Sequence, residues 1–136
     1  MTDAGSTNRR PVILVAEDDD SVRMTLEFVL EDEGFEVVTA ADGQEALGAA
    51  LTVVPDAILL DQMMPKLSGR QVLEALQLRD ETRSIPIFIL SGMDPSLRLP
   101  GVEGDVADQW AGAQFVGKPF DPEELVAGIR RALSQR

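Results

Sequence analysis

Residues 57–69 read AILLDQMMPKLSG, a short apolar run that ends in one acidic residue and is followed at once by a proline and a glycine. The apolar residues 57–60 are typical of a strand buried on both faces, and Pro65 with Gly69 forces the chain out of it. We therefore expect Asp61 at the carboxyl end of a buried strand, where open α/β sheets bind ligands. By itself, this aspartate is equally well explained as a helix cap or a turn residue.

Strands and helices alternate along the rest of the chain. Apolar runs predict further strands at residues 12–16, 35–40, 86–91 and 115–118. Helical periodicity predicts helices from Val22 to a stop at Gly34, from the turn at Asp42-Gly43 through Leu51, from Gly69 to Leu78, and from Asp121 through Leu133. This alternation indicates an α/β fold in which a doubly wound parallel sheet lies between two layers of helices.

One segment, residues 92–112, breaks this regularity. Its Pro95 and Pro100, with two glycines close behind, exclude a long regular helix. Only residues 106–111 have a helical pattern. The fourth helix is therefore expected to be short or irregular and to follow a long loop.

Length and composition indicate one domain of ordinary size. Residues 1–10 are polar and lack the apolar centre of a signal peptide, so we expect a disordered lead-in there and a single domain over residues 11–136. No run of about 18 apolar residues predicts a membrane span. The chain has no cysteine, which excludes disulfides and thiolate metal sites and suits a reducing cytoplasm.

The charge and the missing residue types limit the chemistry further. A formal net charge of −12 argues against binding of DNA or RNA by this domain, which requires clustered Lys and Arg. The absence of histidine removes the commonest general base and metal ligand. Any chemistry has to rest on carboxylates, hydroxyls, lysine and backbone groups.

Polar side chains stand at the carboxyl ends of four of the five expected strands, and these ends share one edge of a parallel sheet. They are Glu17, Asp18, Asp61, Ser91 and Lys118. Three converging carboxylates repel one another unless a cation compensates them, and hard oxygen ligands suit Mg²⁺. A magnesium site with a reactive carboxylate, a hydroxyl and a lysine is what a phosphoryl group requires, with Asp61 as the in-line nucleophile.

Four segments carry a family resemblance: VILVAEDD at residues 12–19, DQMMPKLSG at 61–69, LSG at 90–92 and VGKPF at 116–120. In this order they resemble the receiver domain of bacterial two-component response regulators, over residues 12–133. The resemblance implies a flavodoxin-like fold with the strand order 2-1-3-4-5. It also implies a cis peptide bond between Lys118 and Pro119, an isomer that only proline makes accessible.

The resemblance implies a phosphorylation-dependent signalling switch rather than a turnover enzyme. Asp61 would accept a phosphoryl group, and the metal ligands would be Glu17, Asp18, Asp61 and the main-chain carbonyl of Met63. These would hold Mg²⁺, with Mn²⁺ as an alternative. On phosphorylation, Ser91 would move toward the phosphoryl group and Phe115 would turn inward.

The partners that the resemblance implies are proteins of a phosphorelay. The phosphoryl donor would be a sensor histidine kinase or a histidine phosphotransfer protein, and the receiver of the signal a downstream protein or a fused output domain. The family also allows a homodimer that forms on phosphorylation. No output domain is expected within this chain, which ends at Arg136 soon after its last helix.

Several positions depart from the usual pattern of the family. Ser91 stands where threonine is commoner in the family. Phe115 replaces a frequent tyrosine, so its ring can pack but cannot hydrogen-bond through a hydroxyl. The alternative to a switch role for Phe115 is simple core packing. Trp110 and Leu99, in the irregular segment, are expected either at a partner contact or in the core.

Met63 and Met93 occupy positions that flank the path of the hydrolytic water in the family. Two apolar side chains there should hinder water and prolong the phosphorylated state.

Two other functions compete with the switch. One is a Mg²⁺-dependent phosphohydrolase with an aspartyl nucleophile, of the haloacid-dehalogenase type, but such enzymes usually have a second aspartate where this chain has Met63. The other is a pseudo-receiver that works by constitutive binding, which the complete set of acidic, hydroxyl and lysine residues argues against.

Overall fold

Asp61 is the last residue of β3 (Ala57–Asp61), the central strand of a five-stranded parallel sheet. The computed structural model describes residues 9–92, 96–98, 100–105, 110 and 113–135. The other strands are β1 (Val12–Ala16), β2 (Glu36–Ala40), β4 (Ile87–Ser91) and β5 (Ala113–Gly117). Their order is β2-β1-β3-β4-β5, with every neighbouring pair parallel, which confirms the predicted topology.

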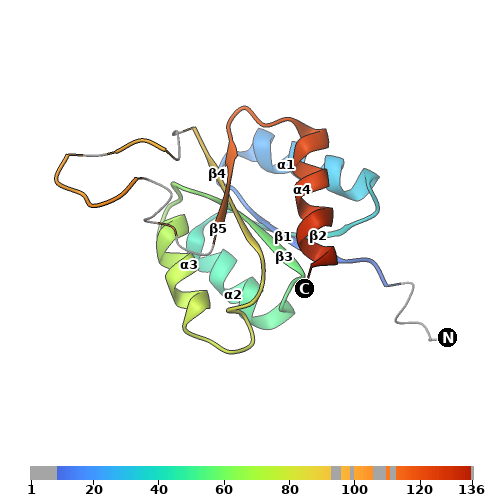
Figure 1. Ribbon diagram of the computed structural model, residues 1–136. Helices are drawn as coiled ribbons and strands as arrows, with labels where there is room; N and C mark the ends of the chain where they lie inside the picture. The colour runs from blue at the N-terminus through green and yellow to red at the C-terminus, as the bar shows by residue number, and fades with distance from the viewer. Residues whose placement is uncertain (1–8, 93–95, 99, 106–109, 111–112, 136) are drawn as a thin grey trace.

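Within the described residues, four α-helices cover the two faces of this sheet. They are α1 (Asp20–Asp32), α2 (Gly43–Val53), α3 (Gly69–Gln77) and α4 (Pro122–Ser134). As Figure 1 shows, α1 and α4 lie on one face, and α2 and α3 lie on the other. All five residues of β3 are buried because helices cover it on both sides.

Alternation of side chains along the strands divides the core in two. Val15 and Leu59 pack on the side of α1 and α4, whereas their neighbours Leu14 and Leu60 pack on the side of α2 and α3. Successive side chains of a strand point to opposite faces. The same alternation continues past the strand ends and decides on which face each polar residue emerges.

The loop after β3 is held against the start of α2 through short backbone contacts. The N–H of Gly43 donates to the main-chain oxygen of Pro65 at 3.2 Å, and a Cβ at Gly43 would overlap the main-chain oxygen of Leu67. Lys66 has a positive φ of 71°, and its ammonium lies 3.4 Å from Asp42. This packing fixes the path of the chain directly after Asp61.

Side chains accept hydrogen bonds from backbone N–H groups in the first turns of α1, α2 and α3. Asp19 caps α1, and Asp42 caps α2. Ser68 forms a capping box with Gln71 at the start of α3. The capped helices begin near the sheet edge at which the strands end, because α1, α2 and α3 follow β1, β2 and β3 through short loops.

The predicted boundaries of the strands and of α1 to α4 hold to within two residues, and the second and fifth strands are among those that differ. β2 begins at Glu36 rather than Phe35, whose ring is buried, and β5 begins at Ala113 rather than Phe115 and ends at Gly117. β5 is longer because it pairs with the whole length of β4. The Lys118–Pro119 bond is cis, as predicted.

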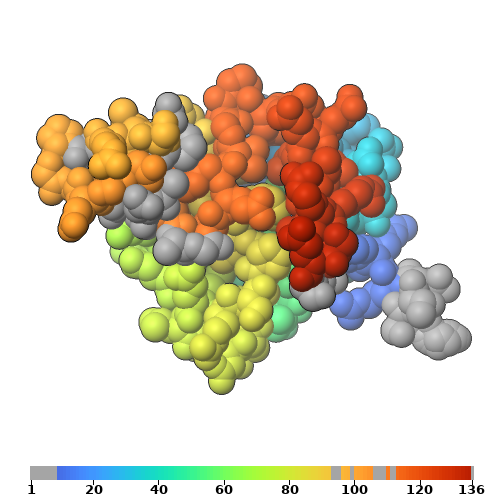
Figure 2. All heavy atoms as spheres, in the orientation of Figure 1, coloured from blue at the N-terminus to red at the C-terminus, as the bar shows by residue number. Residues whose placement is uncertain are grey.

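The structure describes only part of the irregular segment and of the N-terminal residues. The described residues 96–98 and 100–105 lie to one side of the molecule, beyond α3, where the space-filling view shows them as a projection (Figures 1 and 2). No α-helix occurs in the described residues between β4 and β5. The expected helical pattern at 106–111 falls outside the described residues apart from Trp110. Residues 1–8 of the expected lead-in are also outside them.

Gly43→Ala is expected to lower the free energy of unfolding by about 1–3 kcal/mol, because the added Cβ overlaps the main-chain oxygen of Leu67. The matched control is Gly48→Ala in the same helix, where a Cβ meets nothing within 4 Å. This control should raise the stability by about 0.5–1 kcal/mol, because alanine has the higher helix propensity. Urea unfolding followed by circular dichroism measures both. Equal changes in the free energy of unfolding of the two variants would show that the close approach of Gly43 to the main chain of Leu67 does not affect stability.

Candidate functional site

Three ionisable side chains emerge on the same face of the sheet at its carboxyl edge. Glu17 follows Val15 by two residues, Asp61 follows Leu59, and Lys118 follows Val116. Each of these apolar residues packs in the core next to α1 and α4. Side chains two residues apart point to the same face, so the three polar groups are brought together above that core.

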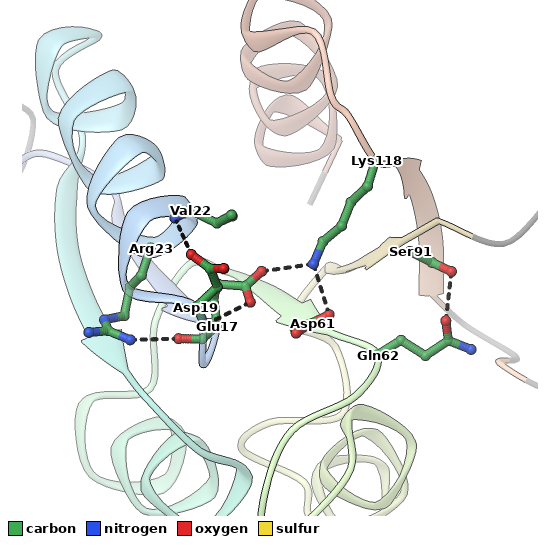
Figure 3. A network of polar contacts seen from close by, with 8 residues as sticks. All are labelled: Glu17, Asp19, Val22, Arg23, Asp61, Gln62, Ser91 and Lys118. Carbon is green, nitrogen blue, oxygen red and sulfur yellow. Dashed lines mark hydrogen bonds and ion pairs between the residues drawn. The ribbon is translucent and has the colours of Figure 1, made fainter.

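The ammonium of Lys118 lies between the two carboxylates (Figure 3). Its Nζ is 3.0 Å from Oε1 of Glu17 and 3.1 Å from Oδ1 of Asp61. Glu17 is only 1% exposed and Asp61 7%, whereas the lysine side chain is 30% exposed. One cation therefore bridges two buried acids that come from β1 and β3, and the bridge is made from the edge strand β5.

The backbone around Glu17 is held from α1. The N–H of Asp19 donates to Oε2 of Glu17 at 3.1 Å, and Nη1 of Arg23 donates to the main-chain oxygen of Glu17 at 2.9 Å. Arg23 was not singled out from the sequence. Its position one helical turn after the cap Asp19 is the signal that marks it, because a side chain there points back toward the strand end.

Burial and the hydrogen bonds that join Lys118 to the two acids shift the pKa values of Glu17 and Lys118 in opposite directions. Burial raises the pKa of Glu17, and the neighbouring Asp61 adds to that rise, while the hydrogen bonds from Lys118 and Asp19 oppose it. Burial alone would lower the pKa of Lys118, but its hydrogen bonds to Glu17 and Asp61 outweigh that effect and raise its pKa. Lys118 therefore remains a cation at neutral pH.

The acidic side chains have the geometry and the donor atoms of a site for a hard metal ion. Glu17, Asp18 and Asp61 each offer one carboxylate oxygen, and these oxygens lie within 4.8 Å of one another. Asp18 is exposed, so solvent reaches the cluster from its side. Oxygen donors open to water fit Mg²⁺ or Mn²⁺, which retain water molecules when bound.

Ser91 emerges on the opposite side of the sheet. It follows Ile87 and Ile89, which pack against α2 and α3. Its hydroxyl donates to Oε1 of Gln62 at 2.6 Å, and in Figure 3 it points to Gln62 and away from Asp61. Sequence reasoning did not select Gln62. The strand register identifies it, because Asp61 pairs with Leu90, and the next residues along are therefore neighbours.

Phe115 lies on the same side as Ser91. It is half-buried and meets Trp110 edge to face, with ring centroids 6.0 Å apart and planes at 89°. Trp110 is 5% exposed, so of its two predicted roles the structure supports core packing. Leu99 and Met93 lie outside the described residues. The side chain of Met63 is 73% exposed.

Residues 13–130 match the family model for the response regulator receiver domain. The chain belongs to this family. Its strand order and the place of its acidic cluster at the carboxyl edge are the arrangement that the resemblance implied. None of the helices in the described part of this receiver domain has the length and apolar character needed to cross a membrane.

Several curated relatives of the receiver domain are regulators of transcription. The chain is 42% identical over 135 residues to the transcriptional regulatory protein PrrA of Mycobacterium tuberculosis, covering 98% of this chain and 54% of that protein. It is 38% identical over 122 residues to the alkaline phosphatase synthesis transcriptional regulatory protein PhoP of Bacillus subtilis, covering 89% and 48%. The chain thus spans about half the length of these relatives.

Solved structures agree with this assignment. A response regulator from Chloroflexus aurantiacus superposes with a TM-score of 0.76 at 30% identity, covering 93% of this chain and 99% of that one. The receiver domain of a sensor histidine kinase from Pseudomonas aeruginosa gives 0.77 at 26% identity, with coverage of 93% and 99%. The latter structure has a magnesium ion coordinated in its active-site cleft.

Lys118→Gln is expected to lower the free energy of unfolding by about 2–4 kcal/mol, because it leaves buried Glu17 beside Asp61 without a cation. The raised pKa of Glu17 should rise further in this variant. The folded state then binds a proton at a pH where the unfolded chain does not. Stability should therefore increase as the pH falls from about 8 toward about 5, more steeply than in the wild type.

Urea unfolding at several pH values measures this effect. Lys66→Gln is the control, because Lys66 is 60% exposed and pairs with Asp42 at the rim, so its loss should change stability far less. Parallel pH profiles for Lys118→Gln and the wild type would contradict the assigned role of the bridge.

Proposed function

We propose that Asp61 is the phospho-acceptor of this receiver domain and takes its phosphoryl group from a phosphohistidine of a sensor kinase or a histidine phosphotransfer protein. The observation that carries this proposal is the position of the Asp61 carboxylate. It ends the central strand, bonds to the Lys118 ammonium at 3.1 Å, and shares an acidic cluster with Glu17 and Asp18. A nucleophile beside a fixed cation is what phosphoryl transfer needs.

In the transfer, a carboxylate oxygen of Asp61 attacks phosphorus. The new P–O bond forms as the P–N bond of the phosphohistidine breaks, and the imidazole keeps the electron pair of that bond. Lys118 neutralises a phosphoryl oxygen in the product, as it neutralises Asp61 before the reaction. The Ser91 hydroxyl donates a hydrogen bond to another phosphoryl oxygen and keeps its proton.

The metal ligands are assigned as Glu17, Asp18, Asp61 and the main-chain carbonyl of Met63, with Mg²⁺ as the ion and Mn²⁺ as an alternative. The cluster of three oxygens within 4.8 Å supports the first three ligands. When bound, the ion supplies positive charge against the carboxylates and the phosphoryl oxygens. Glu17 and Asp18 follow β1 directly, so the strand positions them without help from a flexible loop.

The phosphorylated domain works as a switch and not as a turnover enzyme. Ser91 and Phe115 are the moving residues, and both lie on the side of the sheet that faces α2 and α3. A groove of about 610 Å³ opens on the other face, between β5 and α4, and is lined among others by Phe120 and by Val116, the neighbour of Phe115 in β5. We assign the output contact, to a downstream protein, a fused output domain or a second copy of the chain, to this groove.

The kinase contact is assigned to α1. Met24 and Phe28, one helical turn apart on this helix, are 64% and 72% exposed. Met24 follows Arg23, which bonds to the main-chain oxygen of Glu17, so the patch begins one residue from a contact with the site. Two large apolar side chains exposed together favour a protein partner.

The receiver domain is assigned to residues 11–136 and to the cytoplasm. Pro11 accepts a hydrogen bond from the N–H of Glu36, so the ordered domain includes it. The absence of cysteine supports the assignment to a reducing cytoplasm.

Acetyl phosphate with Mg²⁺ is expected to add the mass of one phosphoryl group to the protein, because a small phosphodonor supplies the same reacting group as phosphohistidine. Intact-mass spectrometry measures the gain. Asp61→Asn and omission of Mg²⁺ should each abolish it, and Asp20→Asn, on the exposed side of α1, should not. No gain in the wild type would favour constitutive binding, and repeated hydrolysis of phosphate esters would favour a phosphohydrolase.

Replacement of both Met63 and Met93 by Asn is expected to speed dephosphorylation severalfold, because polar side chains at these two positions admit and orient water near the acyl phosphate. The loss of the phosphoryl mass over time gives the rate. Leu78→Asn is the control, since Leu78 is 85% exposed at the far end of α3. If the double variant and the wild type lose the group equally fast, the two methionines do not set the lifetime.

A further inference from the structure

The side-chain hydrogen bond between Ser91 and Gln62 fixes the direction of the switch hydroxyl. The Oγ–Oε1 distance is 2.6 Å, and Ser91 is 2% exposed. A serine hydroxyl has one proton, so while it donates to Gln62 it donates to no other acceptor. The amide oxygen of Gln62 therefore determines where this proton points in the unphosphorylated protein.

The backbone on both sides of this contact is fixed. The N–H of Gln62 donates to the main-chain oxygen of Leu90 at 3.2 Å, which extends the β3–β4 ladder by one residue. The N–H of Gly69 donates to the oxygen of Gln62 at 3.1 Å, and the N–H of Lys118 donates to the oxygen of Ser91 at 2.9 Å. Rotation of side chains is thus the simplest way to redirect the hydroxyl.

Side chains at the paired positions Asp61 and Leu90 point to one face of the sheet, and those of the next residues, Gln62 and Ser91, point to the other. Asp61 and Leu90 are paired, and Leu90 packs toward α1 and α4. Ser91, one residue on, points to the side of α2 and α3, as does Gln62 beside it. The resting hydrogen bond accordingly lies on the face opposite to the one from which Asp61 emerges.

We propose that Gln62 is a positioning residue that acts through Ser91: its amide oxygen holds the Ser91 hydroxyl away from Asp61, and this bond breaks before the hydroxyl donates to a phosphoryl group. The proposal rests on the proposed function of Asp61 and Ser91. Gln62 stabilises the resting arrangement only. Its loss therefore favours the phosphorylated arrangement, and a net hydrogen bond between neutral groups corresponds to a roughly fivefold change in an equilibrium constant.

A purely structural role for Gln62 makes a different prediction. If the amide only tied β3 to β4, its removal would lower stability and would affect ligand binding without regard to the residue at position 91. An effect that acts through the hydroxyl has to disappear when the hydroxyl is removed. A double-mutant cycle on Gln62 and Ser91 separates the two.

The experiment measures binding of beryllium fluoride, a phosphoryl analogue, in the presence of Mg²⁺ by isothermal titration calorimetry. The proteins are the wild type, Gln62→Leu, Ser91→Ala and the double variant. Gln62→Leu should bind roughly fivefold more tightly than the wild type. In the Ser91→Ala background, the same replacement should leave the affinity unchanged. Gln77→Leu, an exposed glutamine at the end of α3, is the matched control and should bind as the wild type does.

Unchanged or weaker binding by Gln62→Leu, or an equal gain with and without the Ser91 hydroxyl, would overturn the proposal. Urea unfolding verifies that each variant is folded, and Gln62→Met, with a side chain of similar length and no amide oxygen, replaces a leucine variant that fails to fold. Failure of the proposed function has a separate signature, because wild type and Asp61→Asn would then bind the analogue equally poorly. That result would overturn both proposals.

Discussion

The bridge from the Lys118 ammonium to Glu17 and Asp61 is the interaction on which the rest of the site depends. Two buried carboxylates from adjacent strands would repel each other without it. The lysine is supplied by the chain after β5, three strands away from β1, so the bridge forms only when these strands of the sheet are assembled. The site is thus a consequence of the completed fold, and its charge balance leaves a carboxylate available for a phosphoryl group.

The alternation of side chains along the strands places the ionisable residues of the site and the proposed switch residues on opposite faces of the sheet. Glu17, Asp61 and Lys118 emerge toward α1 and α4, whereas Ser91 emerges toward α2 and α3, the side on which Phe115 meets Trp110. The acidic cluster and the switch residues are therefore adjacent along the sheet edge but lie on opposite faces. In the proposed switch, a change at Asp61 reaches the second face through Ser91, and this makes the resting partner of Ser91, Gln62, important.

The local patterns predicted the strands, the helices and the polar strand ends with few errors. Asp61, Glu17 and Lys118 were placed at one edge because parallel strands share a direction, and the distances between them confirm this. Gln62 was missed because nothing in its own residue type marks it; its role depends on the register between β3 and β4. Trp110 was left between two roles because its burial depends on helices and strands distant in sequence.

The sequence alone determined the fold class, the strand order implied by its family resemblance, and the residue types at the candidate site, because apolar periodicity and short motifs are local properties of the chain. Tertiary structure alone decided that one lysine bridges two acids and that the Ser91 hydroxyl turns toward Gln62. Both contacts join residues brought together by sheet assembly, and their geometry is set by register and by the face on which each side chain emerges.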